Sequence, residues 1–207
     1  MKRNFIANNK INRQSHSNLL YIMTALFLCG VIVGVSIIKS ADSDLKNLIF
    51  TFIDNYISTK CQSNLLMLLS SLLLGLLLFI LFEYMFGLCA VGVPFSIVTL
   101  ILFGVFCGLE ASCIILHWGL KGILYYIMIN LPCNAVTAAI MLKCCCESID
   151  MSLSLFNCIL KIGSIKNKHT DFKEYSIKFL ILILPVTISV IISTILFKIF
   201  CKLFIFV

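Results

Sequence analysis

Charge is what this sequence most lacks. Only 12% of its 207 residues are charged, and 61% are hydrophobic, whereas a soluble protein carries about 25% charged residues. The stretch from Leu65 to Leu116 holds 52 residues and only two charges, Glu83 and Glu110. As one helix it would be roughly 78 Å long, against a hydrocarbon core of about 30 Å, so it must fold back. The composition excludes a soluble domain and predicts an all-α, polytopic membrane protein with a single membrane domain.

Groups for catalysis or metal binding are also scarce. The three histidines lie on different segments, and no Ser-His-Asp set, His-Glu-x-x-His helix or phosphate-binding glycine loop occurs. Most of the eleven cysteines fall inside apolar segments, where cysteine acts as a small hydrophobic residue. The run Cys144–Cys146 is interpreted as reduced thiols, with acylation as the alternative. We therefore expect no enzyme activity, no catalytic residue, no cofactor and no metal.

Five apolar segments are long enough to cross a bilayer. They cover residues 19–38, 65–82, 95–116, 122–142 and 178–198 and follow a basic arm at 1–18. The first is longer than a signal-peptide core and is expected to be retained. With the N-terminus inside, ten basic residues lie on the cytoplasmic side and six outside, which favours a cytoplasmic N-terminus and an outer C-terminus. The net charge of +7 belongs to these membrane flanks and does not indicate nucleic acid.

The outer loop after the first span contains an amphipathic pattern. Between residues 45 and 57 the apolar side chains recur at helical spacing; they are Leu45, Leu48, Ile49, Phe52, Ile53 and Tyr56. Asp42 or Ser43 precedes them as a candidate N-cap. This helix either rests on the membrane surface or offers a docking surface to an extracytoplasmic partner.

Two further segments are irregular or amphipathic. Residues 83–94 are too apolar for a solvated loop, and Gly87, Gly92 and Pro94 interrupt them, which predicts a tight re-entrant turn or a broken helix. The inner segment 143–177 is expected to hold a separate helix that Gly163 ends, followed by a soluble linker.

Two glycine pairs have the spacing that lets helices approach closely. Gly30 and Gly34 form one pair, and Gly104 and Gly108 form the other. In lipid such pairs drive helix packing, because the hydrophobic effect gives no help there. The pairs are interpreted as packing within one molecule, with a homo-oligomer contact as the alternative.

Glu83 and Glu110 are acids at membrane depth. A charge there is costly, so such residues are often functional. Glu83 is expected at the inner interface. Glu110 is a candidate functional acid, with Lys121 or His117 as its partner. Both acids are interpreted as structural or interfacial, with a proton or ion relay as the alternative.

The order of several motifs resembles the stage II sporulation protein M family. The motifs are Gly87-x4-Gly92-x-Pro94, Gly104-x3-Gly108, Gly119-Leu120-Lys121-Gly122 and Leu131-Pro132-Cys133-Asn134, with Leu28-Cys29-Gly30 and Gly34 in the first span. The resemblance covers roughly a third of the chain. It implies that these glycines and prolines, with Lys121 and Asn134, are family positions for packing and bending.

The resemblance implies a function as well. Proteins of that family are non-enzymatic anchors in the sporulation septum and the engulfing membrane. There they localise the stage II sporulation proteins D and P, which degrade peptidoglycan as the membrane moves around the forespore. Two alternatives remain: a small transporter or channel-like protein that uses Glu110 and the segment 83–94, or a superfamily relative with no role in sporulation.

Overall fold

The fold was determined as a computed structural model. It describes the backbone of residues 2–160 and 172–204, and the side chains of residues 18–60, 62–160 and 172–199. Every element in these ranges is a helix, which confirms the predicted all-α class. The elements are α1 (Lys2–Ser40), α2 (Ser43–Gln62), α3 (Leu65–Gly87), α4 (Val93–Trp118), α5 (Leu120–Tyr125), the π-helix η1 (Tyr126–Asn130), α6 (Leu131–Leu160) and α7 (Phe172–Phe204).

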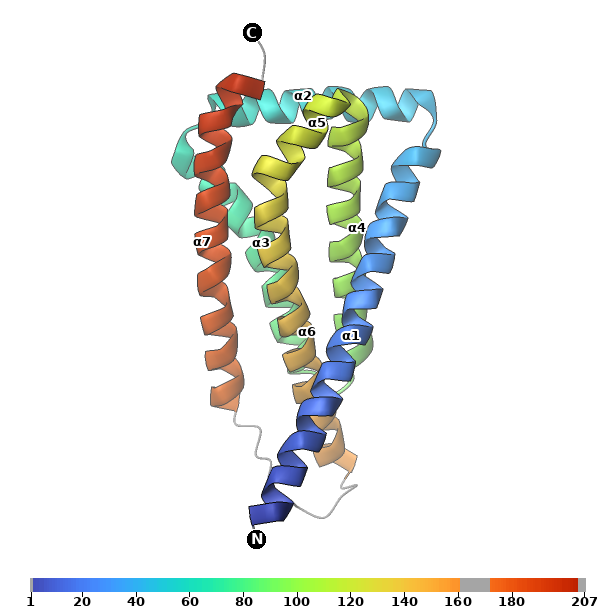
Figure 1. The fold of residues 1–207 in the computed structure, drawn as a ribbon, viewed down its shortest axis with the longest axis vertical. Helices are drawn as coiled ribbons and strands as arrows, with labels where there is room; N and C mark the ends of the chain where they lie inside the picture. Colours follow the sequence, from blue (N-terminus) through green and yellow to red (C-terminus); the bar gives the residue numbers. More distant parts are fainter. Residues whose placement is uncertain (1, 161–171, 205–207) are drawn as a thin grey trace.

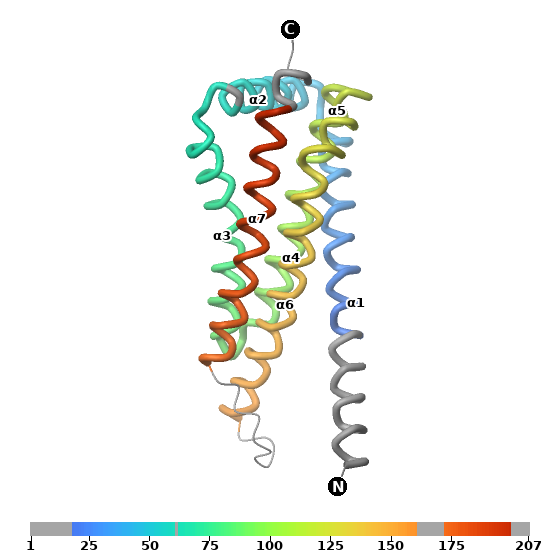
Figure 2. The backbone as a smooth tube through the Cα atoms, turned by 60° about the vertical axis from the view of Figure 1, so that its left-hand side comes forward, coloured from blue at the N-terminus to red at the C-terminus, as the bar shows by residue number. Residues whose placement is uncertain are grey.

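The long helices run up and down, and α2 lies across one end of the bundle (Figure 1). The two termini lie at opposite ends, as an odd number of passes requires. Turned by 60°, the bundle shows α1 at one edge, α3 at the other, and α4 and α6 between them (Figure 2). The five described helices long and apolar enough to cross a membrane make this a multi-pass membrane protein.

The spans extend beyond the predicted limits, most of all the fourth. In place of a span at 122–142 and a separate inner helix, residues Leu120–Leu160 form one apolar helical stretch of 41 residues. The reason is local: the sequence from 143 to 160 contains neither glycine nor proline, so nothing stops the helix after it leaves the predicted span. Gly163 and most of the expected linker lie outside the described residues.

The predicted interruption near 83–94 is a tight turn between two spans. The helix α3 continues through Glu83 to Gly87, residues 88–92 turn, and α4 begins at Val93 with Pro94 in its first turn. A Cβ atom on Gly92 would collide with the carbonyl oxygen of Phe86. The turn therefore needs glycine at this position for close backbone approach, and the chain does not re-enter the bundle.

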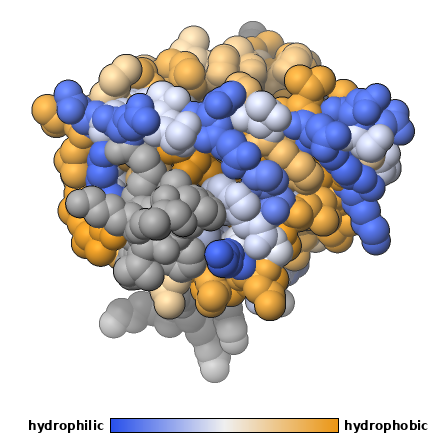
Figure 3. Space-filling model, turned by 90° about the horizontal axis from the view of Figure 1, so that it is seen from above, coloured by the Kyte–Doolittle hydropathy of each residue, from blue (hydrophilic) through white to orange (hydrophobic). Residues whose placement is uncertain are grey.

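The helix α2 is longer than the predicted 45–57, and Asp42 occupies its N-cap position. The Asp42 carbonyl accepts the first helical bond from the Lys46 amide at 3.0 Å, while its side chain makes no capping bond. Ile57 is buried against the bundle, whereas Leu48 and Phe52 are exposed. Seen from above, hydrophilic residues run across this end of the molecule with hydrophobic surface on both sides (Figure 3).

The core lies where α4, α6 and α7 meet. Leu100, Val186 and Val190 are almost completely buried, and so are the three cysteines of Cys144–Cys146. The thiols therefore pack inside the bundle as small apolar groups. This burial argues against the acylation alternative, because an acyl chain needs an accessible thiol.

The topology makes a first prediction. Alkaline phosphatase, which is active only outside the cytoplasm, should be active when fused after Val207 and inactive when fused after Lys168, in the segment 161–171. The reason is the excess of basic residues at the N-terminal end of the bundle. A fluorescent protein that matures in the cytoplasm serves as the control and should give the opposite pattern. Phosphatase activity at Lys168 alone would reverse the orientation.

Candidate functional site: a charged cavity beneath α2

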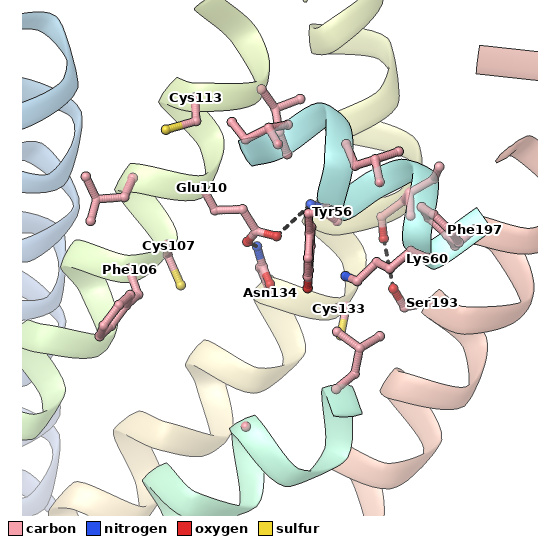
Figure 4. A pocket seen from close by; sticks show the side chains of 18 of the residues that line it. Tyr56, Lys60, Phe106, Cys107, Glu110, Cys113, Cys133, Asn134, Ser193 and Phe197 are labelled. Atoms are coloured by element: carbon pink, nitrogen blue, oxygen red, sulfur yellow. Dashed lines mark hydrogen bonds between the residues drawn. The ribbon is translucent and has the colours of Figure 1, made fainter. Parts of the chain in front are cut away.

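The helices enclose a cavity of about 700 Å³ beneath α2. Helices α2, α3, α4, α6 and α7 all contribute to its walls, together with α5 and η1. Apolar side chains form most of the lining; they include Leu76, Phe79, Phe103, Phe106, Ile129 and Val190. Polar groups gather near the α2 end, as the close view shows (Figure 4). The volume falls within the range of about 300–1,000 Å³ that is usual for ligand pockets.

Glu110 projects from α4 into this cavity, and two amides hold its carboxylate. Its Oε1 atom accepts a hydrogen bond from Asn130 Nδ2 at 2.8 Å, and its Oε2 atom accepts one from Asn134 Nδ2 at 3.0 Å. The same nitrogen of Asn134 lies 3.4 Å from the Tyr126 hydroxyl. The carboxylate is thus oriented by two asparagine side chains of the following span, one of which also contacts the Tyr126 hydroxyl.

The partners suggested by the sequence for Glu110 are wrong. His117 Nε2 lies 2.8 Å from Asp54 Oδ1 instead, so it links α4 to α2. Lys121 is exposed at the end of the bundle. Asn134, which the resemblance suggested as a packing position, is a ligand of Glu110.

The π-helix η1 places these amides. It spans Tyr126–Asn130 and ends two residues before Pro132, which has no amide hydrogen to donate. Asn130 and Asn134 are four residues apart, so they lie on one face of the helix and reach the same carboxylate. Short π-helices are often found at functional sites, because they redirect side chains without ending the helix.

A cation also faces the cavity. Lys60 extends from α2, and its ammonium lies 4.1 Å from the centre of the Tyr56 ring and 6.0 Å from that of Phe197. Figure 4 shows Lys60 and Glu110 pointing into the same space from different helices. The cavity therefore presents one positive and one negative group at its α2 end and apolar walls elsewhere.

The glycine pairs meet outside this cavity, between α1 and α4. A Cβ atom on Gly30 would lie 2.5 Å from the Ile101 carbonyl oxygen, and one on Gly104 would lie 2.5 Å from that of Phe27. Gly34 and Gly108 would meet the backbone of the opposite helix in the same way. All four glycines are buried within the chain, so this surface is not open to a second copy.

The remaining positions that the resemblance pointed to serve turns and contacts. Gly119 ends α4 with a φ of 58°, which favours glycine. A Cβ atom on Gly122 would collide with the Ile114 carbonyl oxygen, and one on Gly87 with the Tyr175 hydroxyl. Pro132 lies exposed in the first turn of α6.

Glu83 lies in a second, sealed polar cluster at the opposite end of the bundle. It is completely buried, not interfacial as expected, and within the described structure neither carboxylate oxygen has a hydrogen-bond partner. Nearby hydroxyls are already engaged: Ser96 and Ser148 bond each other at 2.8 Å, and Ser148 donates to the Glu83 carbonyl at 3.0 Å. Ser152 donates to the Cys89 carbonyl at 2.7 Å, which fastens the turn to α6.

Comparisons with known proteins give no relative. No family model matches the chain, and neither a curated protein nor a solved structure does. Among the described residues, no group of three His, Cys, Asp or Glu side chains is placed to hold a metal.

Sequence reasoning missed two polar residues of the cavity, Asn130 and Lys60, and also Tyr126, whose hydroxyl contacts Asn134. A signal for the first was present, because Asn130 and Asn134 are two amides at i, i+4 spacing inside an apolar span. Lys60 and Tyr126 carried no comparable signal, since their proximity to Glu110 depends on how α2 and η1 pack.

The glycine contact makes a second prediction. Gly108→Ala should destabilise the protein by about 1–3 kcal/mol, because the added methyl group meets rigid backbone of α1. Gly75→Ala is the matched control, since a Cβ atom there has no heavy atom within 4 Å. It should be neutral or stabilise by about 0.5–1 kcal/mol. Thermal unfolding of the purified variants in detergent measures both, and equal midpoints would show that α1 does not pack on α4 in this way.

The sealed acid makes a third prediction. Glu83→Met should raise the midpoint of thermal unfolding, because a buried carboxyl group without hydrogen bonds costs about 1–3 kcal/mol. Glu147→Met is the control. It removes a partly exposed carboxylate 3.0 Å from Lys178 and should lower stability by at most about 1 kcal/mol. A Glu83 variant less stable than the Glu147 variant would mean that the carboxyl group has a stabilising partner.

Proposed function

We propose that this chain is a non-enzymatic membrane scaffold that localises peptidoglycan-degrading enzymes at the engulfing membrane during spore formation. The resemblance to the stage II sporulation protein M family supplies the process and the partners, the stage II sporulation proteins D and P. The observation that carries the proposal is the position of α2, an amphipathic helix fixed across one end of the bundle with an uncovered apolar edge.

One side of α2 is firmly attached to the bundle. Asp54 bonds His117 of α4 at 2.8 Å, and the Phe50 ring stacks on the His117 ring with centroids 4.6 Å apart. Ile57 is 4% exposed. These contacts give α2 a defined orientation, which a helix that merely floats at the membrane surface would not need.

The other edge of α2 is apolar and uncovered. Leu45 is 53% exposed and Leu48 is 68% exposed, and neither lines the cavity. In the predicted orientation this edge lies on the extracytoplasmic side, where peptidoglycan and its degrading enzymes are found. Exposed apolar side chains on a rigid helix suit the docking of a partner protein.

The role of the glycine pairs in helix packing also supports a scaffold. Gly30, Gly34, Gly104 and Gly108 contribute close backbone contacts rather than a reactive group. A protein that only places other proteins needs a rigid membrane body, and these contacts supply one.

A second candidate, a small transporter, is favoured by the cavity and its charged groups. A transport path would have to continue toward the opposite end. There the described helices pack closely, with Leu100, Cys144, Cys145 and Val186 almost completely buried. The sequence also shows no clear inverted repeat, which many transporters have. The remaining alternative is a superfamily relative without a sporulation role. The host organism distinguishes it from the scaffold, because such a host would lack the D and P partners.

The apolar edge of α2 makes a fourth prediction. In a spore-forming host, Leu45→Ser combined with Leu48→Ser should reduce co-purification of the D and P proteins and slow membrane migration around the forespore. Two lost apolar contacts are worth a few kcal/mol at an interface, so a loss of about tenfold or more in captured partner is expected.

Asn47→Ser combined with Thr51→Ser is the matched control, because it changes two exposed residues of the same helix on its polar side. Both double variants should reach the abundance of the unchanged protein. Normal capture and normal migration with the leucine variant would mean that this edge contacts lipid, and the scaffold proposal would lose its docking surface.

A further inference from the structure

The cavity beneath α2 has its mouth at membrane depth. Its exposed lining residues are Ser71 and Gly75 of α3, Phe106 and Glu110 of α4, and Phe52 and Tyr56 of α2. Helices α3 and α4 diverge toward the α2 end (Figure 1). Because exposed lining residues come from both helices, the cavity opens between them. Because α3 and α4 are both spans, this opening faces the bilayer and admits molecules from lipid.

At the end away from α2, aromatic side chains of α3 and α4 pack against one another. The Phe79 ring packs edge-on against Phe103, with centroids 5.4 Å apart, and the Phe86 ring stacks on Phe95 at 5.4 Å. Phe79 and Phe103 also line the cavity and form its apolar floor. The cavity is thus polar near α2 and apolar toward the middle of the membrane, which matches the polarity of a lipid in the outer leaflet.

The polar end offers two opposite charges that are free to meet a ligand. In the described structure neither Glu110 nor Lys60 takes part in an ion pair. Each oxygen of the Glu110 carboxylate accepts one bond from an asparagine amide, and a carboxylate has about four acceptor positions. The Lys60 ammonium rests on the Tyr56 ring and keeps its hydrogen-bond donors. The amides orient the acid without neutralising it.

We propose that this cavity binds a phospholipid of the ethanolamine class. Its primary ammonium bonds Glu110, its phosphate meets Lys60, and an acyl chain lies along the apolar walls and leaves through the mouth between α3 and α4. A choline headgroup has no N–H to donate to the carboxylate. An anionic headgroup without an amine would place its negative charge near Glu110 and has no ammonium to bond the carboxylate. This binding site goes beyond the proposed scaffold and does not depend on it.

The experiment uses the full-length protein in lipid nanodiscs that contain a trace of photoactivatable lipid. Three probes carry the same diazirine acyl chain and differ in headgroup: ethanolamine, choline or glycerol. We expect the ethanolamine probe to label the protein about tenfold more than either of the others, because a hydrogen bond to an ionised group is worth about 1.5–3 kcal/mol. Equal labelling by all three probes, or stronger labelling by the glycerol probe, would overturn the assignment.

Gly75→Trp tests whether the lipid enters through the mouth. The new side chain occupies open space, so the fold should be retained, and labelling should fall to about a tenth or less. Ser70→Trp is the matched control; it adds the same group at an exposed position of α3 that does not line the cavity and should label normally. Equal labelling of the two variants would place the bound lipid outside the cavity.

Two headgroup variants separate the roles of the charges. Glu110→Gln should remove the preference for ethanolamine and leave labelling by the choline probe unchanged. Lys60→Gln should reduce labelling by all three probes, because each has a phosphate. If Glu110→Gln keeps the full preference for ethanolamine, the carboxylate does not bind the ammonium and the proposal fails. Should either variant misfold, the headgroup preference of the unchanged protein and the two tryptophan variants still decide the question.

Discussion

The close backbone contact between α1 and α4 is the constraint on which the rest of the structure depends. In lipid, helices gain little from burying apolar surface, so close packing must supply the attraction. Four glycines allow it, and they fix the rotation of α4 about its axis. Glu110 follows Gly108 by two residues, which is roughly 200° around the helix, so the face opposite α1 carries the acid. The glycine contact therefore determines that Glu110 points into the bundle, toward Asn130 and Asn134, rather than toward lipid.

The two ends of the bundle differ because their polar contacts differ. At the turn between α3 and α4, Ser148 and Ser152 of α6 bond backbone carbonyls, and Tyr175 of α7 donates to the Tyr84 carbonyl at 3.0 Å. These bonds join α3, α6 and α7 with the turn at 88–92, where no water can satisfy free carbonyls. At the other end α2 links the helices from above, and Lys198 reaches the Ser63 carbonyl at 2.7 Å. The helices are thus bonded to one another at the turn end and are bridged by α2 at the other end. Space therefore remains between them beneath α2.

Patterns along the chain predicted the spans, the amphipathic α2 and the glycine pairs, because each depends on residues a few positions apart. The features that the sequence did not predict depend on long-range packing. Glu110 meets amides 20 and 24 residues away, across the turn at Gly119 and the π-helix. The end of α6 was missed for a different reason: hydropathy falls after residue 142, but helix formation needs only the absence of a breaker. Hydropathy marks the extent of the bilayer, whereas propensity and packing decide where a helix ends.

The two membrane acids looked equivalent in the sequence, and their surroundings separate them. Both carry the cost of placing a carboxyl group at membrane depth. Glu83 is sealed, with its neighbouring hydroxyls already bonded to one another and to backbone, so no ligand can reach it. Glu110 is oriented by two amides, remains open to a cavity and shares that cavity with Lys60. An acid that is oriented but left open is arranged to bind, whereas a sealed acid can act only through the stability of the fold. The cavity, rather than the buried cluster, is therefore where this chain can recognise another molecule within the membrane.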